Sequence, residues 1–322
     1  MMKFSWGTNS ANEIGNAIFK ICLYDVPTCN ACAIKAASYF VFLFSKPRTL
    51  QKNRTLKTLF DIRSEKEPGA EHSLLLEIGK DYCTYAVWHK PSQSIDQLQF
   101  ISFQETEGEE QLSNILSAIK VSEFTTVYVC SAMPQSILVP NKFFNSNYEA
   151  LDTIYNQPAQ EYFNDRIAEW QMVNIYSVPQ AIHRQLQQRF PAAQYIHAYT
   201  PAIKVYNGYV ADNQLSVHFT PQYVRVLLKK DTSIHLAQTY YYASPLDVVY
   251  YLLKICYEFE LDQSSVFIIL SGLVEKESNL YTELEQYFTN IHFAHPPEFT
   301  LPENNLPHYF FTSLYNLATC VS

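Results

Sequence analysis

The chain has 322 residues, enough for two domains with substantial cores. Apolar residues make up 48% of it and charged residues 17%, a composition that excludes an intrinsically disordered protein. The net charge of −8 argues against a sequence-independent nucleic-acid binder, so we expect no nucleic-acid partner.

Residues 1–56 do not share the pattern of the rest of the chain, and we expect a poorly ordered leader. An apolar run at 31–44 precedes a basic stretch at 46–57, but Lys35 interrupts it and it is too short to cross a membrane. Weak contact of this basic leader with a membrane surface is the alternative. Seven cysteines, several of them on expected strands, are typical of free thiols and predict a cytoplasmic protein.

The next part of the chain predicts three strands in a meander, followed by a helix and a buried strand. The strands lie between residues 74 and 103, and the polar turn Gly79-Lys80-Asp81 follows the first of them. Apolar residues at helical spacing predict a helix near 112–119. The apolar run 125–130 is typical of a strand that is covered on both faces, which favours a mostly parallel sheet.

The same order of elements recurs 141 positions later, where Tyr82 aligns with Tyr223. Three strands are expected between residues 215 and 242. The segment Ser244-Pro245-Leu246-Asp247 then opens a helix with an N-cap residue, a proline and an acid in the preferred positions. A buried strand at 266–270 completes the repeat.

This repetition predicts an α/β protein with a duplicated ribonuclease-H-like fold, the plan of the actin-like ATPases. We expect two βββαβαβα lobes, the first at residues 57–212 and the second at 213–322. Nearly fifty residues separate the strand ending at Cys130 from the next helix, so we predict a small subdomain inserted at 135–176. Its aromatic side chains are either a partner-binding surface or the small core of the insert. The candidates are Phe143, Phe144, Tyr148, Tyr162, Phe163 and Trp170.

Actin-like ATPases bind nucleotide between their lobes, where glycine-containing turns hold the phosphates and an acid positions the metal's waters. The first turn of this chain keeps Gly79 but has Glu77 where aspartate is usual. The second has Thr220 in place of glycine, and Pro221 lacks a backbone N–H. We therefore expect a vestigial cleft with no cofactor, and ATP with Mg²⁺ only as the alternative. That cleft comprises Glu77, Gly79, His218, Thr220, Ser271 and Gly272.

Other activities find no support among the motifs. A nuclease of this architecture needs an acid near Cys130, and none is present. No Gly-x-Ser-x-Gly or phosphate-binding P-loop motif occurs, and neither the histidines nor the Cys29–Cys32 pair completes a metal site. We predict no catalytic residue and no metal site.

Three motifs, in the same order, resemble the domain-of-unknown-function 3822 family of Bacteroidetes. They are Ser136-Ile137-Leu138-Val139-Pro140 with Phe143-Phe144, then Asp247 with Tyr250-Tyr251-Leu252, and then Ser271-Gly272. The resemblance implies an actin-like ATPase fold without an established activity. We expect an uncharacterised, catalytically silent protein, a pseudoenzyme that acts as a scaffold or adaptor for an unidentified protein. The alternative is a nucleotide-binding phosphotransferase or ATPase with an atypical phosphate site.

Overall fold

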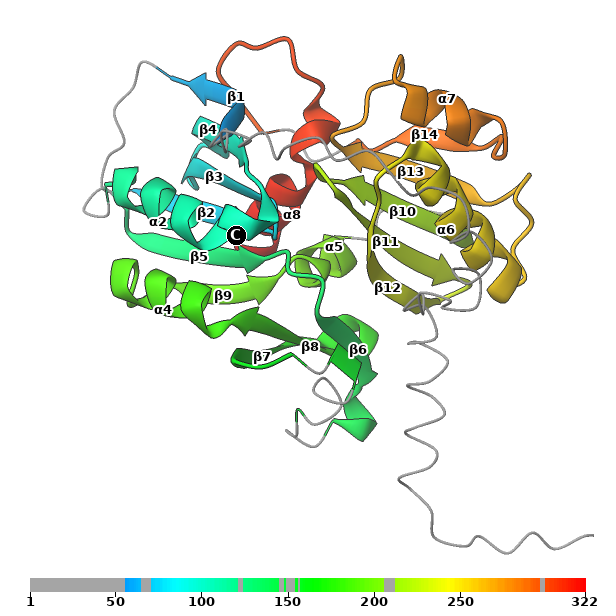
Figure 1. Ribbon diagram of the computed structural model, residues 1–322, viewed down its shortest axis with the longest axis horizontal. Helices are drawn as coiled ribbons and strands as arrows, with labels where there is room; N and C mark the ends of the chain where they lie inside the picture. Colours follow the sequence, from blue (N-terminus) through cyan, green and yellow to red (C-terminus); the bar gives the residue numbers. More distant parts are fainter. Residues whose placement is uncertain are drawn as a thin grey trace, which may run out of the picture. The chain divides into compact units, whose positions relative to one another are not determined.

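The computed structural model describes residues 56–64, 71–120, 124–144, 148, 154–155, 157–205, 212–295 and 299–322. Thr55–Ser322 forms one compact unit (Figure 1). The predicted leader, apart from Leu56, lies outside the described residues, and so does the Cys29–Cys32 pair.

The first lobe is built on a six-stranded sheet in which β2 is central. The strand order is β1 (Lys57–Arg63), β4 (Ser94–Ser102), β3 (Tyr82–His89), β2 (His72–Ile78), β5 (Thr126–Ser131) and β9 (Gln194–His197). Strand β2 pairs antiparallel with β3 and parallel with β5. Every residue of β2 is buried, as expected for a strand covered on both faces.

The second lobe repeats this arrangement in a five-stranded sheet. The order is β12 (Ser233–Tyr241), β11 (Tyr223–Lys230), β10 (Asn213–Phe219), β13 (Phe267–Gly272) and β14 (Ile291–Phe293). Strands β10, β11 and β13 begin and end 141 positions after β2, β3 and β5. The predicted duplicated fold is therefore confirmed, with the register that the sequence repeat indicates.

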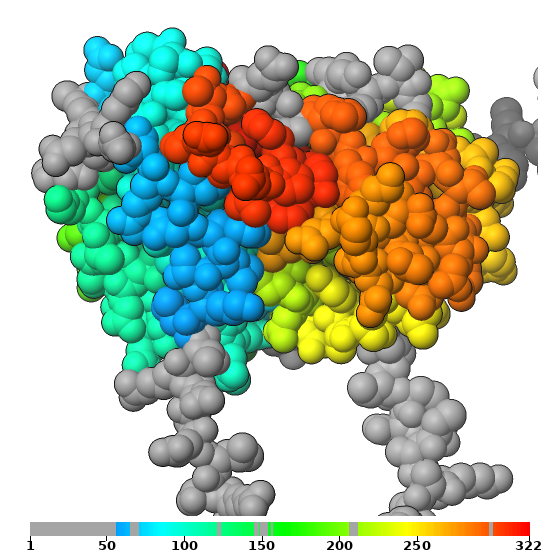
Figure 2. Space-filling model, turned by 90° about the horizontal axis from the view of Figure 1, so that it is seen from above, coloured from blue at the N-terminus to red at the C-terminus, as the bar shows by residue number. Residues whose placement is uncertain are grey.

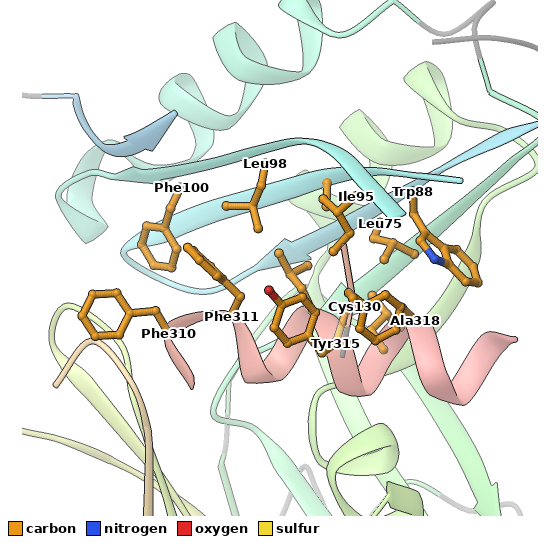
Figure 3. Packing of buried hydrophobic residues seen from close by; sticks show 14 of the residues in the cluster. Leu75, Trp88, Ile95, Leu98, Phe100, Cys130, Phe310, Phe311, Tyr315 and Ala318 are labelled. Carbon is orange, nitrogen blue, oxygen red and sulfur yellow. The ribbon is translucent and has the colours of Figure 1, made fainter. Parts of the chain in front are cut away.

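Helices cover both faces of the first sheet. On one face Leu74 and Leu76 of β2 pack in a cluster with residues of α2 (Gly108–Ala118) and α4 (Gln180–Arg189). On the other face Leu75 belongs to a cluster with residues of the C-terminal helix α8 (Thr312–Val321), as Figure 3 shows. Because side chains alternate along a strand, Glu77 shares the face of Leu75 and points toward α8.

The last helix of each lobe packs on the other lobe. Tyr199 and Ile203 of α5 (Tyr199–Val205) lie in a cluster with Leu227 and Ile234 of the second sheet. Helix α8 follows the second lobe in sequence but packs on the first sheet, and it also contacts α5. Figure 2 shows the C-terminal segment in red between the blue and cyan first lobe and the yellow and orange second lobe.

Two further helices belong to the second lobe, α6 (Pro245–Glu258) and α7 (Asn279–Glu285). The predicted start of α6 is confirmed. Oδ2 of Asp247 accepts hydrogen bonds from the backbone N–H of Ser244 at 2.8 Å and from its hydroxyl at 3.0 Å. These contacts satisfy donors that a helix N-terminus would otherwise leave unpaired.

A third sheet of three strands is inserted in the first lobe, in the order β6 (Ser136–Pro140), β8 (Met172–Pro179) and β7 (Gln160–Ile167). It spans the predicted insert of residues 135–176 and extends to Pro179. Asp165 joins it to the first sheet, because Oδ2 accepts hydrogen bonds from the His197 N–H at 2.8 Å and the Thr200 hydroxyl at 2.7 Å. The short 3₁₀ helices of the described residues are η1 (Glu105–Glu107), η3 (Asn141–Phe143), η4 (Ala168–Trp170) and η6 (His308–Phe311).

Candidate functional site between the lobes

The predicted cleft residues lie at corresponding strand ends of the two lobes. Glu77 and Gly79 end β2 and begin its turn, and His218 and Thr220 do the same after β10. Ser271 and Gly272 end the neighbouring strand β13, where they pair with His218 and Phe219 in parallel register. Nδ1 of His218 and the Ser271 hydroxyl are hydrogen-bonded at 2.9 Å, so four of the six predicted residues meet in the second lobe.

Glu77 is linked to the second lobe by Arg225, a residue of β11 that the sequence analysis did not select. Nη2 of Arg225 donates to Oε1 of Glu77 at 3.1 Å, and the two side chains are only 7% and 1% exposed. The hydroxyl of Tyr82 donates to the same carboxylate oxygen, and the hydroxyl of Ser313 from α8 donates to Oε2. Both oxygens of Glu77 are thus occupied by protein donors.

The electrostatics of this cluster follow from burial and from the ion pair. Burial alone would lower the pKa of Arg225, but Glu77 holds it above its ordinary value. Burial and the adjacent Arg225 charge lower the pKa of His218 well below its usual range, so its imidazole is neutral at pH 7. Burial and the Glu77 charge raise the pKa of Tyr82, which keeps its hydroxyl as a donor. The site is a closed ion pair surrounded by neutral groups.

The two hairpin turns use their own backbone donors. The N–H of Gly79 donates to the Tyr82 carbonyl at 3.0 Å, and the N–H of Thr220 donates to the Tyr223 carbonyl at 2.9 Å. The Thr220 hydroxyl also donates to that carbonyl, at 2.9 Å. Pro221 has no N–H to offer. These donors close the turns on themselves and are not directed at an external phosphate.

Both glycines of the predicted cleft have local structural reasons. A Cβ added at Gly79 would lie 2.3 Å from Cε1 of Tyr82, whose ring fills the space above the turn. Gly272 has φ +76°, and a Cβ there would lie 2.1 Å from the carbonyl oxygen of Phe219. The glycines retained in these turns therefore serve the packing of the turns themselves.

Five of the six aromatic residues proposed for a partner surface are partly buried and pack against hydrophobic clusters of the molecule. Phe144, Tyr148 and Tyr162 pack against the small core of the insert. Phe163 stacks on Tyr176 and Tyr195 of the first lobe, with ring centroids 5.5 and 5.2 Å apart. Trp170 packs in the cluster that includes α5 and the second sheet. Phe143 is exposed, at 46%.

Sequence reasoning missed Arg225 and Ser313. A signal for Arg225 was present, because a charged residue within the apolar run Val224–Leu228 needs a buried partner. Ser313 carried no such signal. Its role depends on how α8 packs against β2, which no local pattern reveals.

The described residues bring together no group of three or more His, Cys, Asp or Glu side chains that could hold a metal ion. Among the helices of the described part of the chain, none is long and apolar enough to cross a membrane.

Apart from the additional edge strand β1, the two sheets have the same strand order, and each lobe's last helix packs on the other lobe. These features define a duplicated ribonuclease-H-like protein of the actin-like type. A Bacteroides thetaiotaomicron protein with actin-like ATPase fold and unknown function is similar, with a TM-score of 0.64 and 15% identity over 78% of this chain and 97% of that one. A chain of the PilM–PilN type IV pilus biogenesis complex has a TM-score of 0.50 and 13% identity, with 79% and 99% covered. The cytoplasmic domain of EpsL, an inner membrane component of the type II secretion system of Vibrio cholerae, has a TM-score of 0.44 and 12% identity, with 78% and 95% covered.

The family of the chain follows from its sequence. Residues 63–291 match the family described as "Protein of unknown function (DUF3822)", and the chain belongs to it. No curated protein matches the sequence significantly.

Proposed function

We propose that this protein is a catalytically silent member of the actin-like fold that works in the cytoplasm as a scaffold or adaptor for another protein. The buried Glu77–Arg225 pair carries the proposal. Glu77 stands in the first turn, where actin-like ATPases usually have an aspartate, and here both of its oxygens are bound by Arg225, Tyr82 and Ser313. Freeing Glu77 for a metal would leave the guanidinium of Arg225 buried without its partner, which costs several kcal/mol.

A partner-binding role also agrees with the complex formed by a protein of similar structure. PilM, to which the chain is similar, occurs in a complex with PilN. Exposed apolar side chains of this chain offer contact points for a protein partner. Among them are Phe143 on the insert and Leu246, Tyr250 and Tyr257 on α6, of which Tyr257 is 83% exposed. The proposal includes no nucleotide cofactor and no nucleic-acid partner, and it keeps weak contact of the basic leader with a membrane surface.

Calorimetric titration with Mg-ATP tests whether the cleft is silent. We expect no binding heat at nucleotide concentrations up to the millimolar range. Clear micromolar binding would favour the alternative, a phosphotransferase or ATPase with an atypical phosphate site. The variant Arg225→Met belongs in the same titration, because binding that appears only when Arg225 is removed would identify the guanidinium as the group that blocks the site.

The adaptor role is tested by quantitative affinity capture from cells of the native source. Three variants are compared with the unmodified protein: Phe143→Ser, the pair Tyr250→Ser and Tyr257→Ser, and the control Leu56→Ser. Leu56 is an exposed apolar side chain before β1, at 40%. We expect one protein to be lost from the capture by one of the first two variants and retained by the control. Capture lists that are identical for all four proteins would count against an adaptor that uses these surfaces.

A further inference from the structure

We propose that Asp81 makes the contact between the two hairpin turns sensitive to pH: the contact is most stable while its carboxyl group is protonated and is weakened when it ionises. Asp81 ends the turn that follows β2, and the opposing turn of the second lobe contains Thr220, Pro221 and Gln222. This inference concerns the closure of the lobes and stands independently of the proposed adaptor function.

The position of Asp81 is unusual for a carboxyl group. It is 1% exposed, and within the described part of the chain neither of its carboxylate oxygens has a hydrogen-bond partner. The backbone N–H groups of Gln222 and of Asp81 itself favour the charged form of the carboxyl group, but neither meets the geometry of a hydrogen bond to its oxygens. Burying an ionised carboxylate in this way is costly, whereas burying the neutral acid costs much less.

The charged and titratable groups around Asp81 do not neutralise it. Glu105 of η1 contributes a second negative charge, and Lys80 directs its ammonium to Glu105 at 3.0 Å. From the second lobe, Tyr223 donates its hydroxyl to Glu105 at 2.9 Å. The phenols of Tyr82, Tyr223 and Tyr242 complete the surroundings, and the charge of Asp81 contributes to the raised pKa of each of them. Among the described residues no cation forms an ion pair with Asp81.

The direction of the pH effect follows from these surroundings. Burial, with a smaller contribution from Glu105, raises the pKa of Asp81 from 3.8 to about 7 in the closed arrangement. Once the turns separate, the carboxyl group is hydrated and its pKa returns toward its ordinary value of about 4. The closed arrangement therefore binds the proton more tightly. The stabilisation of the closed arrangement by this proton is complete below about pH 4 and falls as the pH rises toward 7. Above about pH 7 the stability of the closed arrangement no longer changes through Asp81.

Hydrogen exchange of the full chain tests the proposal, with Asp81→Asn as the variant that cannot ionise. The reporters are two amides that hold the turn residues, each within its own lobe: the N–H of Tyr242, which donates to the backbone carbonyl of Gln222, and the N–H of Phe103, which donates to the backbone carbonyl of Asp81. Comparing the proteins at the same pH cancels the intrinsic pH dependence of exchange. We expect the protection factors of these amides to be higher in Asp81→Asn than in the unmodified protein. The ratio of the two should grow roughly ten- to a hundredfold between pH 5 and pH 7.5.

The matched control is Asp231→Asn. Asp231 lies exposed in the turn between β11 and β12 with φ 53°, a conformation that asparagine adopts readily. The control should exchange like the unmodified protein at every pH. A protection factor for Asp81→Asn that stays in constant ratio to that of the unmodified protein would overturn the proposal. If Asp81→Asn does not fold, carbon-13 NMR of aspartate carboxyl groups in the unmodified protein decides: a midpoint near 7 for Asp81 supports the proposal, and one near 4 refutes it.

Discussion

The guanidinium of Arg225 meets the carboxylate of Glu77 at 3.1 Å although the two lie 148 positions apart in sequence. The pair joins β11 of the second lobe to β2 of the first, and Ser313 adds α8 to the same cluster. It differs from the exposed pair of Arg63 and Asp61, whose side chains are 60% and 39% accessible. A buried pair of this kind contributes little by its presence, but losing one partner leaves an uncompensated charge.

The first prediction concerns this pair. Arg225→Met should lower the free energy of unfolding by about 3–5 kcal/mol, because the carboxyl group of Glu77 is left buried without its counter-charge. Urea unfolding followed by circular dichroism measures the change. Arg63→Met is the control and should cost less than about 1 kcal/mol, since its ion pair is exposed.

The double variant Glu77→Gln with Arg225→Met separates the charge effect from lost packing. It should recover more than half of the stability that Arg225→Met loses, because no buried charge is left. Equal losses in the single and double variants would show that the arginine acts through packing alone.

The second prediction concerns the turn after β13. Gly272→Ala should destabilise the protein by more than about 2 kcal/mol, since alanine is strained at positive φ and its Cβ would collide with the Phe219 carbonyl. Thermal and urea unfolding measure the loss. Gly108→Ala is the matched control, because Gly108 begins α2 and a Cβ there would have its nearest contact at 3.4 Å. We expect it to change stability by less than about 1 kcal/mol. A Gly272→Ala variant as stable as Gly108→Ala would contradict the argument.

The duplicated sheets could be predicted because hydrophobic alternation and turn residues are local signals. The 141-residue repeat even placed Tyr82 on Tyr223, and both residues accept the same turn hydrogen bond in their own lobes. The closed state of the site could not be predicted in the same way. It depends on which strand faces of two lobes meet, and therefore on contacts such as that of Glu77 with Arg225. The aromatic insert shows a related limit, because composition does not distinguish a partly buried residue that packs on the insert's core, such as Tyr162, from an exposed one such as Phe143.

The third prediction concerns the packing of α8. The hydroxyl of Tyr315 is buried without a hydrogen-bond partner among the described residues, within the cluster that joins α8 to the first sheet. Tyr315→Phe should therefore leave stability unchanged or raise it by up to about 1–2 kcal/mol, because it removes an unsatisfied polar group. Tyr199→Phe is the control. Its hydroxyl bonds to that of Thr239 at 3.0 Å, so its loss should cost about 1 kcal/mol. Urea unfolding of both variants checks the ranking, and a clear loss in Tyr315→Phe would indicate a partner such as buried water.

The fourth prediction concerns acid sensitivity at His197, a fully buried residue that ends β9. Its Nε2–H donates to the Met133 carbonyl at 3.0 Å, and Nδ1 accepts the Tyr199 N–H at 3.3 Å, so the imidazole is held neutral. Burial is the main cause that lowers the pKa of His197 from 6.5 to about 3 in the folded protein. The unfolded chain therefore binds more protons between these values. The stability that the neutral imidazole contributes is complete above about pH 6.5 and is lost as the pH falls toward 3.

His197→Gln removes the titrating group, so its free energy of unfolding should fall less steeply on acidification than that of the unmodified protein. The difference between the two should shrink by about 2 kcal/mol between pH 7.5 and pH 5, as measured by urea unfolding at several pH values. His235→Gln, which removes an exposed imidazole of β12, corrects for the general effect of one histidine fewer. Parallel stability curves for His197→Gln and the unmodified protein would mean that His197 has the same pKa in the folded and unfolded states, which would contradict the prediction.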